Sequence, residues 1–288
     1  MNRKKIILFI CLLGVGIGLF FVLRFYQIFF WSNTTFKNEY SYIFIDRDDT
    51  IDSLKIELNS FLKSTVDFDI AAEKKGYTKR ILPGKYRIMK GMGNNQIINT
   101  LRSERLATRV VFNNQERLED LVGRLSIQIE ADSLELLTAF QDSIFLADKG
   151  FNKKNALTMY IPNSYDVFWD ITPADFRKRM LDYHDLFWNE KRIVKARALK
   201  LNQKEVYILA SIIQKESVQL KEQNRIAGVY LNRLKIGMKL QADPTVIFAL
   251  KNETNDFRRI IKRVLYEDLG FKSPFNTYLY HGLPPGPI

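Results

Sequence analysis

Residues 202–217 read NQKEVYILASIIQKES, and this stretch predicts an amphipathic helix in the C-terminal half of the chain. Asn202 and Glu205 have the spacing of a capping box, in which the Asn side chain accepts from a first-turn amide and the Glu side chain accepts from the amide of the cap. A helix is therefore predicted to begin near Gln203. One apolar stripe follows the helical period, and Glu216 falls on it. The stripe contains Val206, Leu209, Ile213 and Leu220.

Glu216 is the candidate catalytic group of this helix. A carboxyl group on an apolar face is expected to be partly buried, and burial disfavours its charged form, which suits a group that donates a proton. The alternative is that Glu216 lies at the ragged end of the helix and pairs with a basic side chain such as Arg225 or Arg233. Periodicity alone favours that alternative. Glu205 is explained by its cap and needs no catalytic role.

Several motifs follow Glu216 in order along the chain. Residues 227–234 read AGVYLNRL, residues 236–246 read IGMKLQADPTV, residues 273–278 read SPFNTY, and residues 282–288 read GLPPGPI. Together with 209–217, these motifs closely resemble the catalytic core of the endolytic murein transglycosylases, the MltG or YceG-like family. In that family the glutamate of the Glu-Ser or Glu-Thr pair is catalytic, so the resemblance implies this role for Glu216, which precedes Ser217.

Polar and aromatic residues in these motifs are the candidate sugar ligands. Asn232, Gln241 and Asn276 can hydrogen-bond acetamido and hydroxyl groups, and Tyr278 can stack on a sugar ring. Gly237 is expected to end the helix that follows Glu216, which places Gln241 on a loop beside the expected sugar-binding cleft. Helix capping is the expected role of Asp243, ahead of Pro244. For Asn232 and Asn276, ordinary capping or turn chemistry remains an equal alternative.

The resemblance also implies a mechanism. Glu216 would protonate the oxygen between N-acetylmuramic acid and N-acetylglucosamine, and would then deprotonate the muramyl C6 hydroxyl, which closes on C1. The product is a 1,6-anhydromuramyl end, formed with neither water nor a cofactor, and no metal is expected. Family knowledge places this cleavage inside nascent peptidoglycan strands, where it terminates glycan elongation beside penicillin-binding-protein synthases.

Two rival functions stay open. One is a hydrolytic muramidase that uses Glu216 with Asp243 or another acid, because ordinary glycosidases need two carboxylates. The other is a non-catalytic, membrane-tethered peptidoglycan-binding scaffold. That rival gains weight from the position of Ile288, since relatives usually continue for several tens of residues after the Pro-Pro-Gly-Pro motif. Either the chain is a truncated form, in which the lost packing is expected to weaken fold and activity, or the segment is dispensable.

The N-terminal segment predicts a membrane anchor. Residues 6–23 carry no formal charge, and eighteen such residues are about the length that crosses a hydrocarbon core of roughly 30 Å. A cleaved signal peptide is the alternative, but aromatic residues follow the run in place of a small-residue cleavage site. Basic residues 3–5 place residues 1–5 in the cytoplasm. The expected topology is a single span at 6–26 in the cytoplasmic membrane, with the catalytic domain extracytoplasmic.

Composition excludes several classes of site. The formal charge of +12 favours an anionic partner, and the predicted topology disfavours nucleic acid while leaving membrane lipid and wall polymers. The single cysteine, Cys11, lies in the apolar run, so neither an intramolecular disulfide nor a thiolate cluster is expected. The two histidines, His184 and His281, are far apart in sequence, which makes a zinc site unexpected.

The exported part is expected to have an α+β fold. A strand is predicted at 40–45, a helix from 51 that carries Phe61 and Leu62, a strand at 85–89 and a helix from 94 or 95. A short polar stem is expected at 32–39. Residues 82–88, LPGKYRI, with 91–92 and 97–101, resemble a LysM-like subdomain over 32–105; a packing module without a ligand is the alternative. The mixed α/β catalytic domain would cover 106–288, with a strand at 109–112 and helices at 115–125 and 132–140.

Overall fold

The computed structural model describes residues 3–288, and these form two compact units. The first unit comprises the described residues up to Val110, with Gln128–Glu130 and Asp166–Ile171. The second comprises Val111–Ile127, Ala131–Tyr165 and Thr172–Ile288. The predicted functional division after residue 105 stays a prediction, because compactness assigns no function to either unit.

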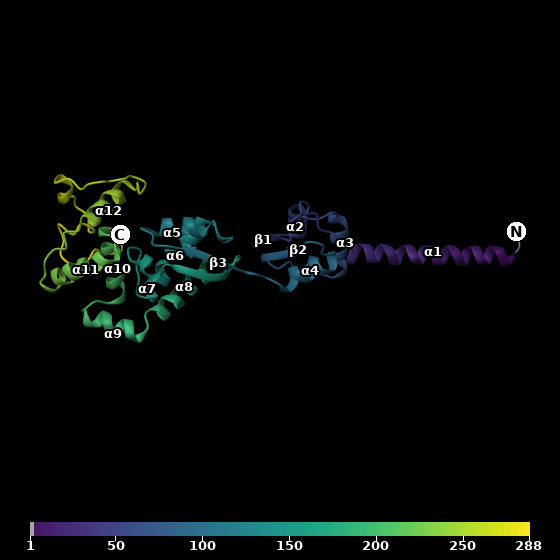
Figure 1. The fold of residues 1–288 in the computed structure, drawn as a ribbon, viewed down its shortest axis with the longest axis horizontal. Coiled ribbons are helices and arrows are strands. Elements are labelled where there is room, and N and C mark those ends of the chain that lie inside the picture. The colour runs from purple at the N-terminus through teal and green to yellow at the C-terminus, as the bar shows by residue number, and fades with distance from the viewer. Residues whose placement is uncertain (1–2) are drawn as a thin grey trace. The chain divides into compact units, whose positions relative to one another are not determined.

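Helix α1, Arg3–Phe30, is one long helix (Figure 1). Its segment Ile7–Phe30 is long and apolar enough to cross a membrane. The predicted cytoplasmic N-terminus, 1–5, includes residues 1 and 2, which lie outside the described residues. At the other end of the helix, Ile28 and Phe29 belong to the buried core of the first unit. Phe29, one of the aromatic residues that follow the apolar run, is therefore a core residue.

The first unit contains a two-stranded sheet and short helices. Its elements are β1 (Tyr40–Ile45), α2 (Ile51–Leu58), α3 (Thr65–Lys74), η1 (Tyr77–Lys79), β2 (Gly84–Met89) and α4 (Asn94–Ser103). The predicted strands are confirmed, and they pair antiparallel from Tyr40 opposite Met89 to Ile45 opposite Gly84. Helix α2 is shorter than predicted: it ends at Leu58, and beyond it the carbonyl of Phe61 accepts from the amide of Thr35 at 2.9 Å.

The end of α1 is fixed to the first unit by buried amide groups. The Asn94 side chain donates to the carbonyl of Ile28 at 2.7 Å, and the Asn33 side chain donates to Asn94 Oδ1 at 2.7 Å. Gly93 lies so close to the helix end that a Cβ atom there would be 2.7 Å from the Phe30 carbonyl oxygen. The predicted polar stem at 32–39 is therefore partly packed into the unit.

The second unit is mainly helical. Its elements are α5 (Leu118–Leu125), α6 (Ser133–Phe140), α7 (Ser143–Asp148), η2 (Ala156–Met159), α8 (Pro173–Phe187), α9 (Glu190–Ala198), α10 (Gln203–Glu216), α11 (Leu220–Lys235), α12 (Asp243–Thr254) and η3 (Glu267–Gly270). Strands β3 (Ala107–Phe112) and β4 (Asn163–Phe168), whose residues are divided between the two units, form a second two-stranded sheet. Helices and strands are mixed, in agreement with the predicted class.

One core of the second unit joins α10, α11 and α12 to the last residues of the described chain. Its buried members are Ile208, Leu209, Ile212, Tyr230, Leu240, Ala242, Phe248, Ala249, Phe275 and Ile288. Because three helices and two loops meet in this core, residues from distant motifs are held close together. The candidate site lies at its edge.

Candidate active site

Helix α10 begins as the sequence predicts. Asn202 is its N-cap; the Asn202 side chain accepts from the Glu205 amide at 3.0 Å, and the Glu205 carboxylate accepts from the Asn202 amide at 2.7 Å. The capping box is thus confirmed. The buried face of the helix consists of Ile208, Leu209 and Ile212, which pack against α11 and α12.

Glu216 is the last residue of α10 and is exposed, so the expected partial burial is wrong. The physical reason is that the helix stops there: Ser217 has extended backbone angles, and no further turn covers the carboxyl group. Leu220, which was expected to extend the apolar stripe, belongs to α11 and is 78% exposed. The turn between the helices is held by Ser217, whose hydroxyl accepts from the Gln219 amide and donates to Glu222.

A phenol holds the Glu216 carboxylate. Tyr230, on α11, is 5% exposed, and its hydroxyl donates to Glu216 Oε1 at 2.6 Å. The pKa of Tyr230 is raised above its usual range, first by burial and then by the hydrogen bond to Glu216 and its negative charge. Among the described residues, Glu216 forms no ion pair with Arg225 or Arg233, so the pairing alternative is not realised.

A second phenol–carboxylate pair lies nearby. The Tyr278 hydroxyl donates to Asp243 Oδ1 at 2.6 Å. The pKa of Tyr278 is raised to about 12, first by burial, then by this hydrogen bond and by the negative charges of Asp243 and Glu216. The expected capping role of Asp243 is wrong: Ala242 is the N-cap of α12, and Asp243 is its first residue, with its carboxylate directed to Tyr278.

Gln241 lies on the loop between α11 and α12, as expected. Gly237, with φ at 69°, follows the end of α11. Gln241 is exposed and has a left-handed backbone with φ at 50°, and its amide donates to the Thr277 carbonyl at 3.1 Å. A buried hydroxyl pair supports this loop, because Thr277 Oγ1 lies 2.9 Å from Thr245 Oγ1 and accepts from the Ala242 amide.

The two predicted asparagine ligands differ in accessibility. Asn232, on α11, is exposed. Asn276 is fully buried, and its side-chain amide donates to the carbonyls of Leu269 and Phe271 at 3.0 and 2.8 Å. Its oxygen accepts from the amide of Tyr278 at 2.9 Å. This geometry favours the turn chemistry that the sequence left open for Asn276, and it places Tyr278.

Sequence reasoning missed Tyr230 and the Thr245–Thr277 pair. Tyr230 lies in the motif AGVYLNRL, four residues after Ile226 and four before Leu234, which gave it the appearance of a core residue. A buried phenol needs a hydrogen-bond partner, and that requirement is the one signal in the sequence. Nothing in the spacing identifies the partner, because Glu216 is fourteen residues away on another helix.

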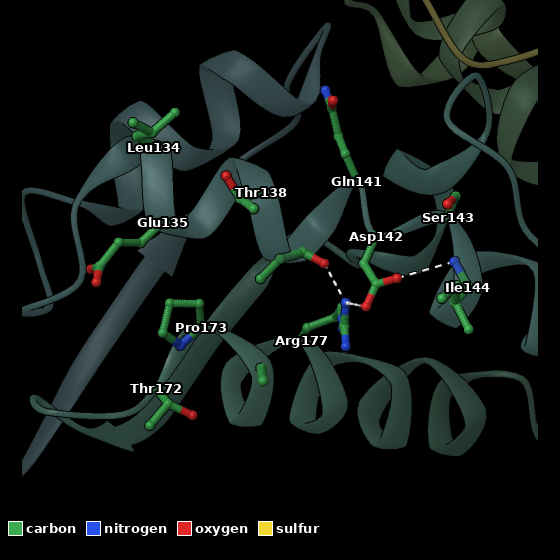
Figure 2. Close-up of a pocket in the computed structure, with 12 residues that line it drawn as sticks. Leu134, Glu135, Thr138, Gln141, Asp142, Ser143, Ile144, Thr172, Pro173 and Arg177 are labelled. Atoms are coloured by element: carbon green, nitrogen blue, oxygen red, sulfur yellow. Dashed lines mark hydrogen bonds and ion pairs between the residues drawn. The ribbon is translucent and has the colours of Figure 1, made fainter.

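A separate cavity of about 800 Å³ lies among α6, α7 and α8 (Figure 2). At its base, Arg177 donates to the Ala139 carbonyl and to Asp142 Oδ2. The pKa of Asp142 is lowered, first by a hydrogen bond from the amide of Phe145 and then by Arg177. None of the predicted site residues lines this cavity. In the described part of the chain, no cluster of three or more His, Cys, Asp or Glu side chains is arranged to hold a metal ion.

Comparisons with known proteins cover both units. The sequence profile of the YceG-like family matches residues 43–288. An endolytic murein transglycosylase of Bacillus subtilis (strain 168) is 28% identical over 254 residues, which cover 81% of this chain and 67% of that protein. A protein of the same name from Streptococcus pneumoniae (strain R6) is 24% identical over 265 residues, and this chain spans 46% of its length.

A solved structure extends the comparison to the fold. The crystal structure of a yceG-like protein from Listeria monocytogenes superposes with a TM-score of 0.55 at 24% identity, covering 86% of each chain. That likeness shows a shared fold. Because the family profile matches most of the sequence, including every residue of the candidate site, the chain belongs to the YceG-like family.

Proposed function

We propose that this chain is a membrane-anchored, endolytic lytic transglycosylase that cleaves the bond between N-acetylmuramic acid and N-acetylglucosamine in nascent peptidoglycan, with Glu216 as its catalytic residue. The enzyme class, a lyase acting on peptidoglycan, is supported by family membership and by relatives named endolytic murein transglycosylases. The observation that carries the proposal is the exposed Glu216 carboxylate, held on one oxygen by a buried phenol.

The hydrogen bond from Tyr230 gives the two carboxylate oxygens of Glu216 different roles. Oε1 accepts from the phenol at 2.6 Å, which restrains rotation of the carboxyl group and leaves Oε2 to carry the transferable proton. A general acid must present its proton in one direction, so this restraint favours proton transfer to a bound glycosidic oxygen. Tyr230 is therefore a positioning residue in the proposal.

The chemical step balances with one carboxyl group. The proton on Glu216 moves to the glycosidic oxygen as its bond to muramyl C1 breaks, so N-acetylglucosamine leaves with a hydroxyl group. The Glu216 carboxylate then takes the proton of the muramyl C6 hydroxyl, whose oxygen bonds to C1. Glu216 regains its proton, and the new strand end is a 1,6-anhydromuramyl residue.

Exposed side chains around Glu216 are the proposed ligands of the strand. Gln241 is held with its backbone in a fixed left-handed conformation by the loop containing Thr277, and Asn232 lies exposed on α11. Tyr278 is partly exposed and is anchored through Asp243, and its ring is the proposed stacking surface for a sugar. Asn276, which is fully buried, contributes by holding the Tyr278 segment.

The anchor supports the proposed location. Helix α1 contains a segment of 24 residues with the length and composition of a span, and its end is packed directly into the first unit. In the proposed topology α1 crosses the cytoplasmic membrane once, and the rest of the first unit and the whole second unit lie outside, where they reach strands made by penicillin-binding-protein synthases. The LysM-like character of residues 32–105 belongs to the same proposal.

Mass spectrometry of purified glycan strands after incubation with the full chain tests this function. A lytic transglycosylase yields anhydromuramyl ends. A hydrolase that uses Glu216 with Asp243 yields ends that are heavier by one water, and a scaffold binds strands without producing new ends. Either of the last two results contradicts the proposal.

A further inference from the structure

The most strongly charged exposed segment of the second unit is the connection between α12 and η3. Residues 258–263 read RRIIKR, so four cations fall within six residues. All four basic side chains are exposed, and in the described part of the chain none of them has a side-chain hydrogen bond or an ion pair. They are Arg258, Arg259, Lys262 and Arg263. The segment has no helix or strand, and Figure 1 shows it as an extended tube after α12.

Large exposed apolar side chains lie between and directly after these charges. Ile260 is 82% exposed, Tyr266 is 92% exposed, and Leu265 is 51% exposed. Exposed apolar side chains that gather on one segment indicate an interaction surface. We call residues 258–266 the basic-apolar loop.

Both ends of the basic-apolar loop are fixed, which leaves its centre free. At the first end, Phe257 packs on Phe248 with ring centroids 5.5 Å apart and lies under the guanidinium of Arg117 at 3.9 Å. At the second end, the Asp268 carboxylate accepts from the Leu265 amide at 2.8 Å. Asp256 similarly accepts from the amides of residues 258 and 259. The carboxylates of Asp256 and Asp268 therefore bind backbone amides and not the neighbouring cations.

We propose that the basic-apolar loop docks on the surface of an anionic phospholipid bilayer. A bilayer interface offers phosphate groups to Arg and Lys and an apolar layer to Ile and Leu, and Tyr is favoured at the boundary between them. A soluble polyanion such as a phosphate-rich wall polymer would match the four cations but would leave Ile260 and Leu265 in water. The combination of exposed cations and exposed apolar side chains therefore favours an anionic membrane over a soluble polyanion as the partner.

Because α1 anchors the chain, a weak interaction between the basic-apolar loop and the bilayer is sufficient for docking. An exposed loop with a few basic and apolar residues binds lipid only marginally by itself, and stable attachment needs a second signal. Helix α1 supplies that signal, because a tethered loop meets the bilayer at high effective concentration. The loop would then hold the second unit, with its candidate site, near newly made strands. This proposal rests on the proposed membrane anchor and not on the catalytic role of Glu216.

The test uses the full chain in lipid nanodiscs, with a polarity-sensitive fluorophore on a single cysteine. In a Cys11→Ser background, Ile260→Cys is labelled in phosphatidylcholine discs and in discs containing phosphatidylglycerol. The label is expected to shift to the blue and gain intensity only in the anionic discs, and the change should disappear at high salt. A matched label at Ile144, which is also 82% exposed, should not respond.

A charge variant isolates the loop. Replacing one cation, as in Arg259→Gln, should weaken the docked state about fivefold, since each basic residue near an anionic surface contributes at about that level. The Arg259 side chain has no hydrogen bond or ion pair among residues 3–288, so the melting temperature should stay the same. The proposal is overturned if the Ile260 label behaves identically in both lipids, or if it responds to soluble polyphosphate and not to anionic discs.

Discussion

The hydroxyl of Tyr230 lies 2.6 Å from Glu216 Oε1, although the two residues belong to different helices. The rest of the tyrosine is buried in the core that joins α10, α11 and α12. The contact therefore transmits the rigidity of the core to a carboxyl group that is itself exposed. It gives the candidate catalytic residue a fixed direction without removing it from solvent.

Replacing Tyr230 by Phe should lower kcat and leave KM nearly unchanged, because the ring still fills the core and only the hold on Glu216 is lost. A hydrogen bond to a charged group contributes about 1.5–3 kcal/mol, so the rate should fall roughly 10- to 150-fold. Steady-state kinetics of strand cleavage provide the measurement.

The matched control is Tyr207→Phe. Tyr207 lies on α10, the helix that carries Glu216, and its hydroxyl donates to the Tyr160 carbonyl, away from Glu216. This variant should keep the parent rate. Equal losses in the two variants would mean that phenol removal acts through packing and not through the position of Glu216.

The unfolding free energy should decrease at high pH partly through Tyr278. Its pKa is raised from 10.0 to about 12, so the folded state keeps a proton that the unfolded state loses. The stabilisation is complete below about pH 10 and disappears as the pH rises through about 12. Chemical denaturation at several pH values should give a shallower decline for Tyr278→Phe. Identical slopes in parent and variant would show that this phenol ionises normally.

Alanine substitutions at Asn276 and Asn232 should distinguish a structural role from a substrate-binding role. Asn276→Ala leaves the buried carbonyls of Leu269 and Phe271 without their donor, so it should cost about 1–3 kcal/mol of unfolding free energy and lower the melting temperature. The Asn232 side chain is exposed, so Asn232→Ala should change the unfolding free energy little while raising KM for glycan strands. If Asn276→Ala were as stable as the parent and had a raised KM, Asn276 would instead be a substrate-binding residue.

Local patterns in the sequence predict the helix starts and the paired strands well. Asn202 and Glu205 determine the start of α10, and the alternation at 40–45 identifies β1, because both depend on neighbouring residues alone. The exposure of Glu216 could not be predicted, since it depends on where α10 ends and on the course of the next segment. For the same reason, periodicity extended the apolar stripe to Leu220 across a break.

The contacts that build the candidate site are non-local. Tyr278 reaches Asp243 across 35 positions, and Thr277 reaches Thr245 across 32. Capping preferences indicated that Asp243 would serve α12, yet a tertiary partner takes its carboxylate. Sequence motifs indicated which segments belong to the site, whereas the pairing of side chains within it required the packing of the second unit.

The central claim is tested most directly by comparing anhydromuramyl products of Glu216→Gln and Glu205→Gln, two variants of one helix. Loss of general acid catalysis should reduce the rate of Glu216→Gln by about 10² to 10⁴-fold without unfolding it. Glu205→Gln keeps a side chain that a capping box accepts, so its rate should stay near that of the parent. Anhydromuramyl ends formed by Glu216→Gln at close to the parent rate would contradict the account.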